Sequence, residues 1–265
     1  DVEDRGYQFG DGVYEVINIY DGIAFTLDEH IERLYRSAKE ISLVVPYTKH
    51  LLKENILQLI MANRQKSGGV YVQITRGTAP RKHHYDKQIK PILIAYPLPY
   101  NDVTNAQQDG VKAIIAEDLR WLRCDIKSLN LLYNIMVKQQ AHNNEAFEAI
   151  LIRDNIVTEG SSSNIFIIKE ATIFTHPANN FILNGITRQR LLQIFKEKNW
   201  SYVETTFSKD ELLNADEVFL TSTTNEVIPI TIINQTQIGD GKRGSFTSDI
   251  QRAFKEKVVE ETKGS

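Results

Sequence analysis

The chain has little of several features that would assign it to a specialised class of protein. Its 265 residues include one cysteine, Cys124, so no internal disulfide can form, and we expect this residue to be buried. No apolar run approaches the roughly 20 residues of a membrane-spanning helix, and no signal-peptide pattern opens the chain. The net charge of −3 provides no basic surface for nucleic acid. Together these absences predict a globular protein of the cytoplasm.

Two nucleotide-binding motifs are also missing. The glycine-rich residues 4–12 (DRGYQFGDG) do not have the G-x-G-x-x-G spacing, and they precede a predicted strand instead of following one. No G-x-x-x-x-G-K-[ST] stretch is present. His83 and His84 are adjacent, but their loop contains no Cys, Asp or Glu at ligand spacing. The sequence therefore predicts neither a dinucleotide fold nor a P-loop, and no metal site.

The composition is that of an ordinary globular protein, with 42% hydrophobic and 25% charged residues. The length suffices for two domains. Residues 97–102 (PLPYND) interrupt regular structure, so we expect a small α+β domain over residues 1–100 and a larger α+β domain over residues 101–265. The chain begins without Met in a polar stretch, and we expect that N-terminal residues are missing from it.

Hydrophobic periodicity predicts mixed strands and helices, and tight turns between several strands exclude a purely parallel sheet. Thr26 and Glu29 form a capping box that begins the first helix, and the apolar stripe of this helix leaves Arg33 on the solvated face. A second helix is expected with Leu52, Ile56, Leu59 and Ile60 on one face, ended by residues 67–69 (SGG), and another helix is expected over residues 128–142. Residues 21–22 (DG) predict a two-residue hairpin turn, and residues 208–211 (SKDE) predict the cap of a short helix. The predicted strands cover residues 13–20, 70–75, 91–96, 110–117, 147–152, 165–168 and 218–220.

Lys127 is the first candidate for a catalytic residue. It lies in residues 120–132 (RWLRCDIKSLNLL), between charged residues and an apolar run. Apolar neighbours disfavour the charged form of a lysine, which makes the free amine accessible. A free amine in a closed site forms Schiff bases with carbonyl compounds, pyridoxal phosphate among them. Taken alone, the pattern also fits a solvated surface lysine.

Other segments carry polar groups whose local pattern is ambiguous. Arg81 has a planar fork suited to a carboxylate and His83 can add a donor, although the same residues fit a solvated basic loop. Glu159 opens the hydroxyl-rich residues 159–164 (EGSSSN), which also have the composition of an ordinary turn. Residues 184–188 (NGITR) precede a helix whose free N–H groups would bind an anion, although most helix starts hold only water.

Taken in order, six blocks of sequence resemble one enzyme family. The sequence is similar to the fold-type IV pyridoxal-phosphate enzymes, which include branched-chain aminotransferases, D-amino-acid aminotransferases and aminodeoxychorismate lyase. Its blocks look most like the bacterial D-amino-acid (D-alanine) aminotransferase branch, and they extend over nearly the whole chain. The blocks are DRGYQFGDGVYE, T-R-G-T-A-P-R-x-H, RWLRCDIKSLNLL, VTEGSSSN, THPANNFILNGITR and TSTTNE.

The resemblance implies a two-domain α+β fold with pyridoxal 5′-phosphate at the domain interface. Lys127 would carry the cofactor as a Schiff base and would move protons during the reaction. Glu159 would pair with the pyridine nitrogen, keeping it protonated so that the ring acts as an electron sink. The phosphate would be bound by Arg33, by the N–H groups of Ile186 and Thr187, and by Thr223 in the hydroxyl-rich residues 221–226 (TSTTNE). For Arg33 this role replaces the solvated position that periodicity predicts.

The resemblance also implies how the substrate is bound. Tyr14, which periodicity alone would place as a half-buried core tyrosine, would form a trap for the substrate α-carboxylate with Arg81 and His83. In this branch the Arg-x-His loop reaches the site of the neighbouring subunit, so a homodimer is expected. No metal is expected.

The expected reaction is transfer of the amino group from D-alanine to 2-oxoglutarate, which gives pyruvate and D-glutamate by a ping-pong mechanism. An L-branched-chain aminotransferase of the same fold is the nearest alternative, and a lyase that makes 4-aminobenzoate is another; Arg81 and His83 argue against both. A catalytically silent cofactor-binding module is a more distant alternative, since Lys127, Glu159 and the carboxylate trap are all present.

Overall fold

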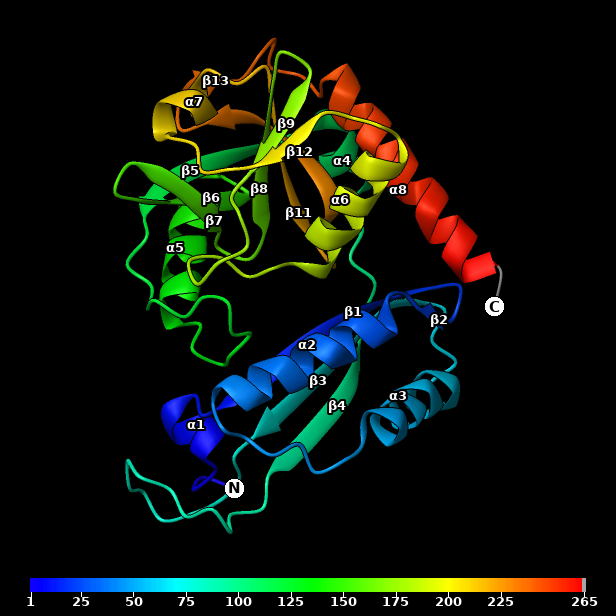
Figure 1. Cartoon of the computed structure of the whole chain (residues 1–265), viewed down its shortest axis with the longest axis vertical. Helices are drawn as coiled ribbons and strands as arrows, with labels where there is room; N and C mark the ends of the chain where they lie inside the picture. The colour runs from blue at the N-terminus through cyan, green and yellow to red at the C-terminus, as the bar shows by residue number, and fades with distance from the viewer. Residues whose placement is uncertain (264–265) are drawn as a thin grey trace. The chain divides into compact units, whose positions relative to one another are not determined.

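A computed structural model describes residues 1–263 of the chain (Figure 1). Contacts divide the chain into two compact units. The first unit contains residues 1–101, 126–131 and 261–263, and the second contains residues 102–125 and 132–260. Lys127 was expected in the larger domain, but its contacts place it in the first unit.

The first unit is built on a four-stranded antiparallel sheet with the order β2-β1-β3-β4. The turn between β1 and β2 is formed by Asp21 and Gly22, both at positive φ, as the hairpin pattern predicted. β3 begins at Ser67, so the glycines after it, expected to end a helix, belong to the strand. The strands are β1 (Gly12–Tyr20), β2 (Ile23–Ala24), β3 (Ser67–Thr75) and β4 (Ile92–Leu98).

Two long helices, α2 (Leu27–Glu40) and α3 (Lys49–Ala62), form the core of this unit with the sheet. Figure 1 shows α2 lying along the strands. The predicted apolar stripes of both helices are confirmed, because their members join one buried cluster with alternate residues of β1 and β3. The buried cluster includes Val13, Ile17, Ile31, Leu34, Leu52, Ile56, Val70 and Val72.

Two local predictions in this unit were wrong, and one short helix was not predicted. Thr26 is at the start of α2 but has φ 52°, and its hydroxyl donates to the Phe25 carbonyl, so it does not cap the helix. Arg33 is buried instead of solvated because it pairs with a strand residue that periodicity within one helix cannot reveal. The short helix α1 (Arg5–Phe9) was not predicted; it is bounded by an Asp4 cap and by Gly10 at φ 66°, and it is too short for an apolar stripe.

The segment around Lys127 runs beside the start of β1. The Tyr14 N–H donates to the Lys127 carbonyl at 3.0 Å, and the Leu129 N–H donates to the Gly12 carbonyl at 3.0 Å. These bonds hold the segment extended, so the helix predicted over residues 128–142 begins only at the start of α5 (Leu132–Asn143). The extended backbone thereby ties Lys127 to the strand that carries Tyr14.

The second unit contains a nine-stranded sheet with parallel and antiparallel pairs, in the order β10-β9-β8-β11-β12-β5-β6-β7, with β13 paired to β12. The mixed pairing confirms that the sheet is not purely parallel. Its strands are β5 (Val111–Glu117), β6 (Glu148–Arg153), β7 (Ile156–Gly160), β8 (Asn164–Lys169), β9 (Thr172–Thr175), β10 (Tyr202–Glu204), β11 (Glu217–Ser222), β12 (Glu226–Ile233) and β13 (Thr236–Gln237).

Helices cover parts of this sheet. Helix α5 packs against β5 and β6, and α6 packs against β11 (Figure 1). Ser208 caps α7 with Glu211 in a complete capping box, as the sequence predicted. None of the helices within residues 1–263 has the length and apolar character to cross a membrane. Besides α5, the helices are α4 (Thr104–Asp109), α6 (Ile186–Glu197), α7 (Lys209–Leu213) and α8 (Ser245–Lys263).

Candidate functional site

The predicted site residues fall into two groups, one in each unit. The first unit contains five of them, Tyr14, Arg33, Arg81, His83 and Lys127, and the second contains four, Glu159, Ile186, Thr187 and Thr223.

Lys127 and Tyr14 are brought together in the first unit. The Lys127 Nζ lies 4.4 Å from the centroid of the Tyr14 ring, within the range of a cation–π contact. Lys127 is partly exposed between two buried neighbours, Ile126 and Ser128, and its N–H donates to the Ser37 hydroxyl at 3.2 Å. The backbone is thus held on both sides while the amine remains accessible.

Arg33 is part of a buried charged cluster with Glu15 and His30. Its Nε and Nη2 donate to the two carboxylate oxygens of Glu15 at 2.6 and 2.8 Å, and His30 Nδ1 lies 2.7 Å from the same carboxylate. Burial raises the pKa of Glu15, but Arg33 and His30 outweigh it and hold this pKa far below the usual value. Burial lowers the pKa of His30. One signal for this cluster was present in the sequence, since His30 and Arg33 are three residues apart on a helix.

Arg81 and His83 lie in an exposed loop and share a neighbour in α1. The Arg81 guanidinium carbon is 4.9 Å from the centroid of the Phe9 ring, and the His83 ring is 5.8 Å from it, centroid to centroid. The loop turns at Gly77, which has φ 105°, and a Cβ there would lie 2.0 Å from the Lys90 carbonyl oxygen. Both side chains therefore pack against the same aromatic ring of α1.

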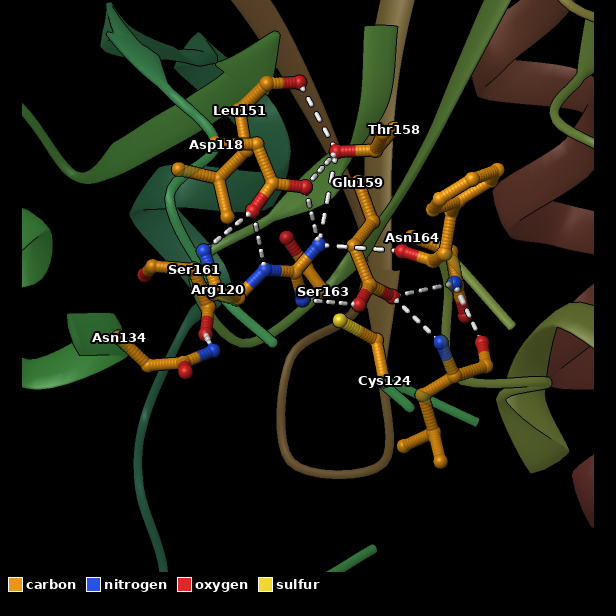
Figure 2. Close-up of polar contacts among 12 residues, drawn as sticks. Asp118, Arg120, Cys124, Asn134, Leu151, Thr158, Glu159, Ser161, Ser163 and Asn164 are labelled. Carbon is orange, nitrogen blue, oxygen red and sulfur yellow. Dashed lines mark hydrogen bonds and ion pairs between the residues drawn. The ribbon is translucent and has the colours of Figure 1, made fainter. Parts of the chain in front are cut away.

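Glu159 is the centre of the second group (Figure 2). It is 5% exposed at the end of β7, and one carboxylate oxygen is paired with the Arg120 guanidinium. The other oxygen accepts from the Asn164 side-chain amide at 3.2 Å and from the Leu183 N–H at 3.0 Å. Three donors from three separate segments therefore fix the orientation of this carboxylate.

Arg120, which the sequence analysis did not select, is itself held by a further carboxylate. Its Nε and Nη2 each donate to Asp118 at 2.8 Å, and Nη2 donates to the Phe181 carbonyl at 3.1 Å (Figure 2). Burial raises the pKa of Asp118, but Arg120 and the Thr158 hydroxyl lower it to about 2. Arg120 is thus shared between two buried carboxylates.

Burial dominates the ionisation of Glu159. It raises the pKa of this carboxyl to about 7, although Arg120 and the Leu183 N–H act in the opposite direction. The protonated and ionised forms of Glu159 are therefore close in free energy near neutral pH. A buried carboxyl with this property is a candidate partner for a titratable ligand atom.

The raised pKa of Glu159 predicts a pH-dependent stability. Between pH 4.5 and about 7 the folded state binds a proton that the unfolded state has released, so stability falls as pH rises through this window. The loss due to this group is about 3 kcal/mol, since one pKa unit corresponds to about 1.4 kcal/mol. Chemical unfolding of the ligand-free protein at several pH values measures this loss in the free energy of unfolding.

The control for this measurement is Glu159→Gln, because His30 contributes with the opposite sign. The pKa of His30 is lowered, so its contribution to stability rises with pH towards 6.5 in both proteins. The free energy of the wild type minus that of the variant isolates Glu159 and should decrease from pH 4.5 to 7. A flat or rising difference would mean that Arg120 keeps Glu159 ionised throughout.

The serines after Glu159 bind a buried carboxylate. Glu148 is fully buried, and it accepts hydrogen bonds from the Ser161 hydroxyl and, at 2.8 Å, from the Ser163 hydroxyl. The side-chain amide of Asn134 donates to the Ser161 carbonyl at 2.8 Å (Figure 2). The hydroxyls that looked like ordinary turn residues therefore hold the backbone that follows Glu159.

The start of α6 has the properties of an anion site. Gly185 caps it without a side-chain hydrogen bond, so the first N–H groups of the helix, which begins at Ile186 and Thr187, are not capped by that residue. Within residues 1–263, the Thr221 hydroxyl is a buried group for which no hydrogen-bond partner is found. Thr221 pairs with Asn164 across the sheet, and a Cβ on Gly185 would lie 2.2 Å from the Asn164 side-chain oxygen. The unpaired hydroxyl and the helix start are thus both next to Asn164.

Thr223 lies in the turn between β11 and β12 and is partly exposed. It follows Thr221 by two residues, so it belongs to the same end of β11. The described residues contain no group of three or more His, Cys, Asp and Glu side chains arranged to hold a metal ion. Within the second unit, a buried carboxylate, a helix start and a buried hydroxyl for which no partner is found fit an anionic ligand with a titratable ring atom. Within the first unit, the accessible amine of Lys127 fits a carbonyl group.

Comparisons with known proteins identify the family. The family model for class IV amino-transferases matches residues 12–233. A D-alanine aminotransferase of Bacillus licheniformis is 55% identical over 99% of this chain and 93% of its own. The solved branched-chain amino acid aminotransferase of Escherichia coli is 27% identical, with a TM-score of 0.89 over 96% of this chain and 88% of its own. A branched-chain enzyme of T.th., solved with pyridoxamine 5′-phosphate, is 25% identical, with a TM-score of 0.87 over 97% and 88%. This chain belongs to the class IV aminotransferases.

Proposed function

We propose that the protein is a pyridoxal-phosphate-dependent D-amino-acid aminotransferase that converts D-alanine and 2-oxoglutarate to pyruvate and D-glutamate in two half-reactions. The geometry that supports cofactor chemistry best is Glu159, a buried carboxylate oriented by three donors. The choice of D-amino acids rests on the similarity to a D-alanine aminotransferase, at 55% identity over nearly the whole chain.

Different residues would bind different parts of the cofactor. Lys127 would hold it covalently through Nζ, and Glu159 would face its ring nitrogen. Arg33, the N–H groups of Ile186 and Thr187, and the hydroxyl of Thr223 would bind its phosphate. When bound, the cofactor supplies an electron sink for the negative charge that develops at the substrate Cα.

Protein groups control the protons and charges around that chemistry. Lys127 Nζ, once released, would take the proton from the substrate Cα and deliver it to the C4′ carbon of the cofactor, acting as general base and then as general acid. Its contact with the Tyr14 ring confines the amine to one region. Arg120 holds Glu159 in a fixed direction, so the partner of the ring nitrogen does not need to reorient during turnover.

The substrate α-carboxylate would be bound by Tyr14, Arg81 and His83. A guanidinium pairs with a carboxylate through two parallel hydrogen bonds, and an imidazole adds a third donor. We propose that the protein is a homodimer in which Arg81 and His83 reach the site of the neighbouring subunit. The exposure of both side chains agrees with such an arrangement, because it leaves them available to a second chain.

The second candidate is an L-branched-chain aminotransferase, which the two solved relatives bring into consideration. These relatives are 27% and 25% identical, whereas the D-alanine aminotransferase is 55% identical. Arg81 and His83 favour the D-amino-acid enzyme in addition, since they supply the predicted carboxylate trap.

A half-reaction on the purified protein with bound cofactor distinguishes the two candidates. D-alanine and L-leucine are added separately, and the visible absorption band of the cofactor is followed. Bleaching with D-alanine alone is expected. Bleaching with L-leucine alone would assign the protein to the branched-chain group and would remove the proposed role of Arg81 and His83. A protein that acquires no band with added pyridoxal phosphate would be a silent relative.

A further inference from the structure

The loop that carries Arg81 and His83, residues 77–85 (the trap loop), is attached to α1 by backbone hydrogen bonds. The Arg5 N–H donates to the Gly77 carbonyl at 2.9 Å, and the Ala79 N–H donates to the Glu3 carbonyl at 3.2 Å. Asp4 and Thr78 form an isolated antiparallel bridge. The first half of the trap loop is therefore paired like a short strand with the residues that open α1.

The second half of the trap loop is held by one buried side chain. Arg5 is 4% exposed, and its Nη1 and Nη2 donate to the carbonyls of Lys82 and His83 at 2.6 and 3.2 Å. Its Nε donates to Asp11 at 2.8 Å. Each guanidinium nitrogen thus has an acceptor, and two of the three acceptors are the backbone carbonyls of consecutive loop residues. The side chains of Arg81 and His83 remain exposed.

Arg5, the anchor of the trap loop, is itself fixed to the core of the first unit. Asp11 also accepts from Arg76 Nε at 2.8 Å, and Arg76 is 6% exposed. Arg76 donates to the carbonyls of Ile41 and Ser42, at the end of α2, at 2.7 and 3.0 Å. Arg5 therefore connects the exposed trap loop to buried structure through one shared carboxylate.

The Phe9 ring of α1 packs against both exposed side chains, Arg81 and His83. The Phe9 ring lies 4.8 Å from the Arg5 guanidinium carbon and 4.9 Å from that of Arg81. The His83 ring is 5.8 Å from it. One ring therefore contacts the anchor and both predicted carboxylate ligands, and the packing limits the directions in which Arg81 and His83 can point.

We propose that Arg5 is a positioning residue that presets the substrate-carboxylate trap. Because it fixes the backbone at Lys82 and His83 before the substrate arrives, the cost of ordering an exposed loop is not subtracted from carboxylate binding. Only arginine can bond three separate acceptors in a fixed planar fork, so lysine would keep the charge but lose the geometry. The inference rests on the proposed role of Arg81 and His83.

The test is Arg5→Lys in the holoenzyme, with Arg64→Lys, a change at an exposed arginine of the same unit, as control. The measurements are KM and kcat for the amino acid that bleaches the cofactor, and the inhibition constant of propanoate, which offers only a carboxylate. In Arg5→Lys we expect KM and the propanoate constant to rise together by roughly tenfold, with kcat within about twofold, because misplacing a ligand weakens binding. Arg64→Lys should change none of them.

A merely structural role for Arg5 would give a different result. A fall in kcat with KM and the propanoate constant unchanged, or no change in a folded variant, would overturn the proposal. If Arg5→Lys does not fold, Asp11→Asn tests the same positioning, because it removes the charged partner that orients the Arg5 Nε and keeps the size of the side chain, and both constants should rise by about threefold. If L-leucine and not D-alanine bleaches the wild type, the proposed function fails and the trap with it. If D-alanine bleaches the wild type and Arg5→Lys leaves KM and the propanoate constant unchanged, only the role of Arg5 fails.

Discussion

Replacing Lys127 with alanine is expected to abolish the visible cofactor band and to reduce turnover to background. The amine would form the covalent link and carry the proton, and loss of proton transfer alone costs about 10²- to 10⁴-fold in rate. Losing the covalent link adds to that effect. Absorption spectra and transamination assays of the purified variant measure both.

The structure makes the interpretation of this variant simple. Lys127 is held in place by backbone bonds, through its carbonyl to Tyr14 and its N–H to Ser37, which alanine keeps. The fold should therefore survive. Lys127→Arg is the matched control: it keeps the charge beside the Tyr14 ring but has no nucleophilic amine, so it should be equally inactive. A small primary amine added to Lys127→Ala should recover part of the turnover. If Lys127→Ala retains the band, another residue holds the cofactor.

The parts of the fold that the sequence predicted are those that depend on local pattern. Apolar residues at helical spacing in α2 and α3 are buried, and the Asp21-Gly22 turn lies where a two-residue hairpin needs positive φ. Ser208 forms its capping box because both partners lie within four residues. In each case the determining contacts are close in sequence.

The errors occur where a distant partner overrides the local pattern. Arg33 looked solvated within α2, but Glu15 on β1 draws it inward. The helix predicted from residue 128 starts later because Lys127 and Leu129 bond to the start of β1. A single sequence without spatial contacts does not contain these pairings.

The candidate site divides in the same way, into residues that the sequence analysis selected and residues that only the structure identified. The family resemblance selected the residues proposed to touch cofactor and substrate, but it did not select those that hold them, such as Arg120 and Glu148. Arg120 stands in a block that the analysis singled out, and a buried carboxylate at Glu159 requires a cation. That requirement is the one signal that could have identified Arg120 in advance.

Arg81→Ala is expected to weaken use of the amino-acid substrate by about 10- to 100-fold in kcat/KM, with the cofactor still bound. Hydrogen bonds to a charged partner contribute about 1.5–3 kcal/mol, which corresponds to this range. The guanidinium is exposed and packs on Phe9, so its removal should leave the fold intact. Steady-state kinetics with D-alanine, together with the absorption spectrum, measure the two properties separately.

The neighbouring residue provides a control of matched charge and exposure. Lys82 is exposed and lies beside Arg81, and the trap loop contacts Arg5 through the Lys82 carbonyl, which Lys82→Ala keeps. Equal losses in both variants would therefore mean that the loop attracts substrate by general positive charge and not by a specific trap. Release of cofactor from Arg81→Ala would show that the proposed separation between the carboxylate trap and the phosphate-binding residues, among them Arg33 and Thr187, is wrong. A selective loss in Arg81→Ala requires the fixed guanidinium geometry that α1 supports.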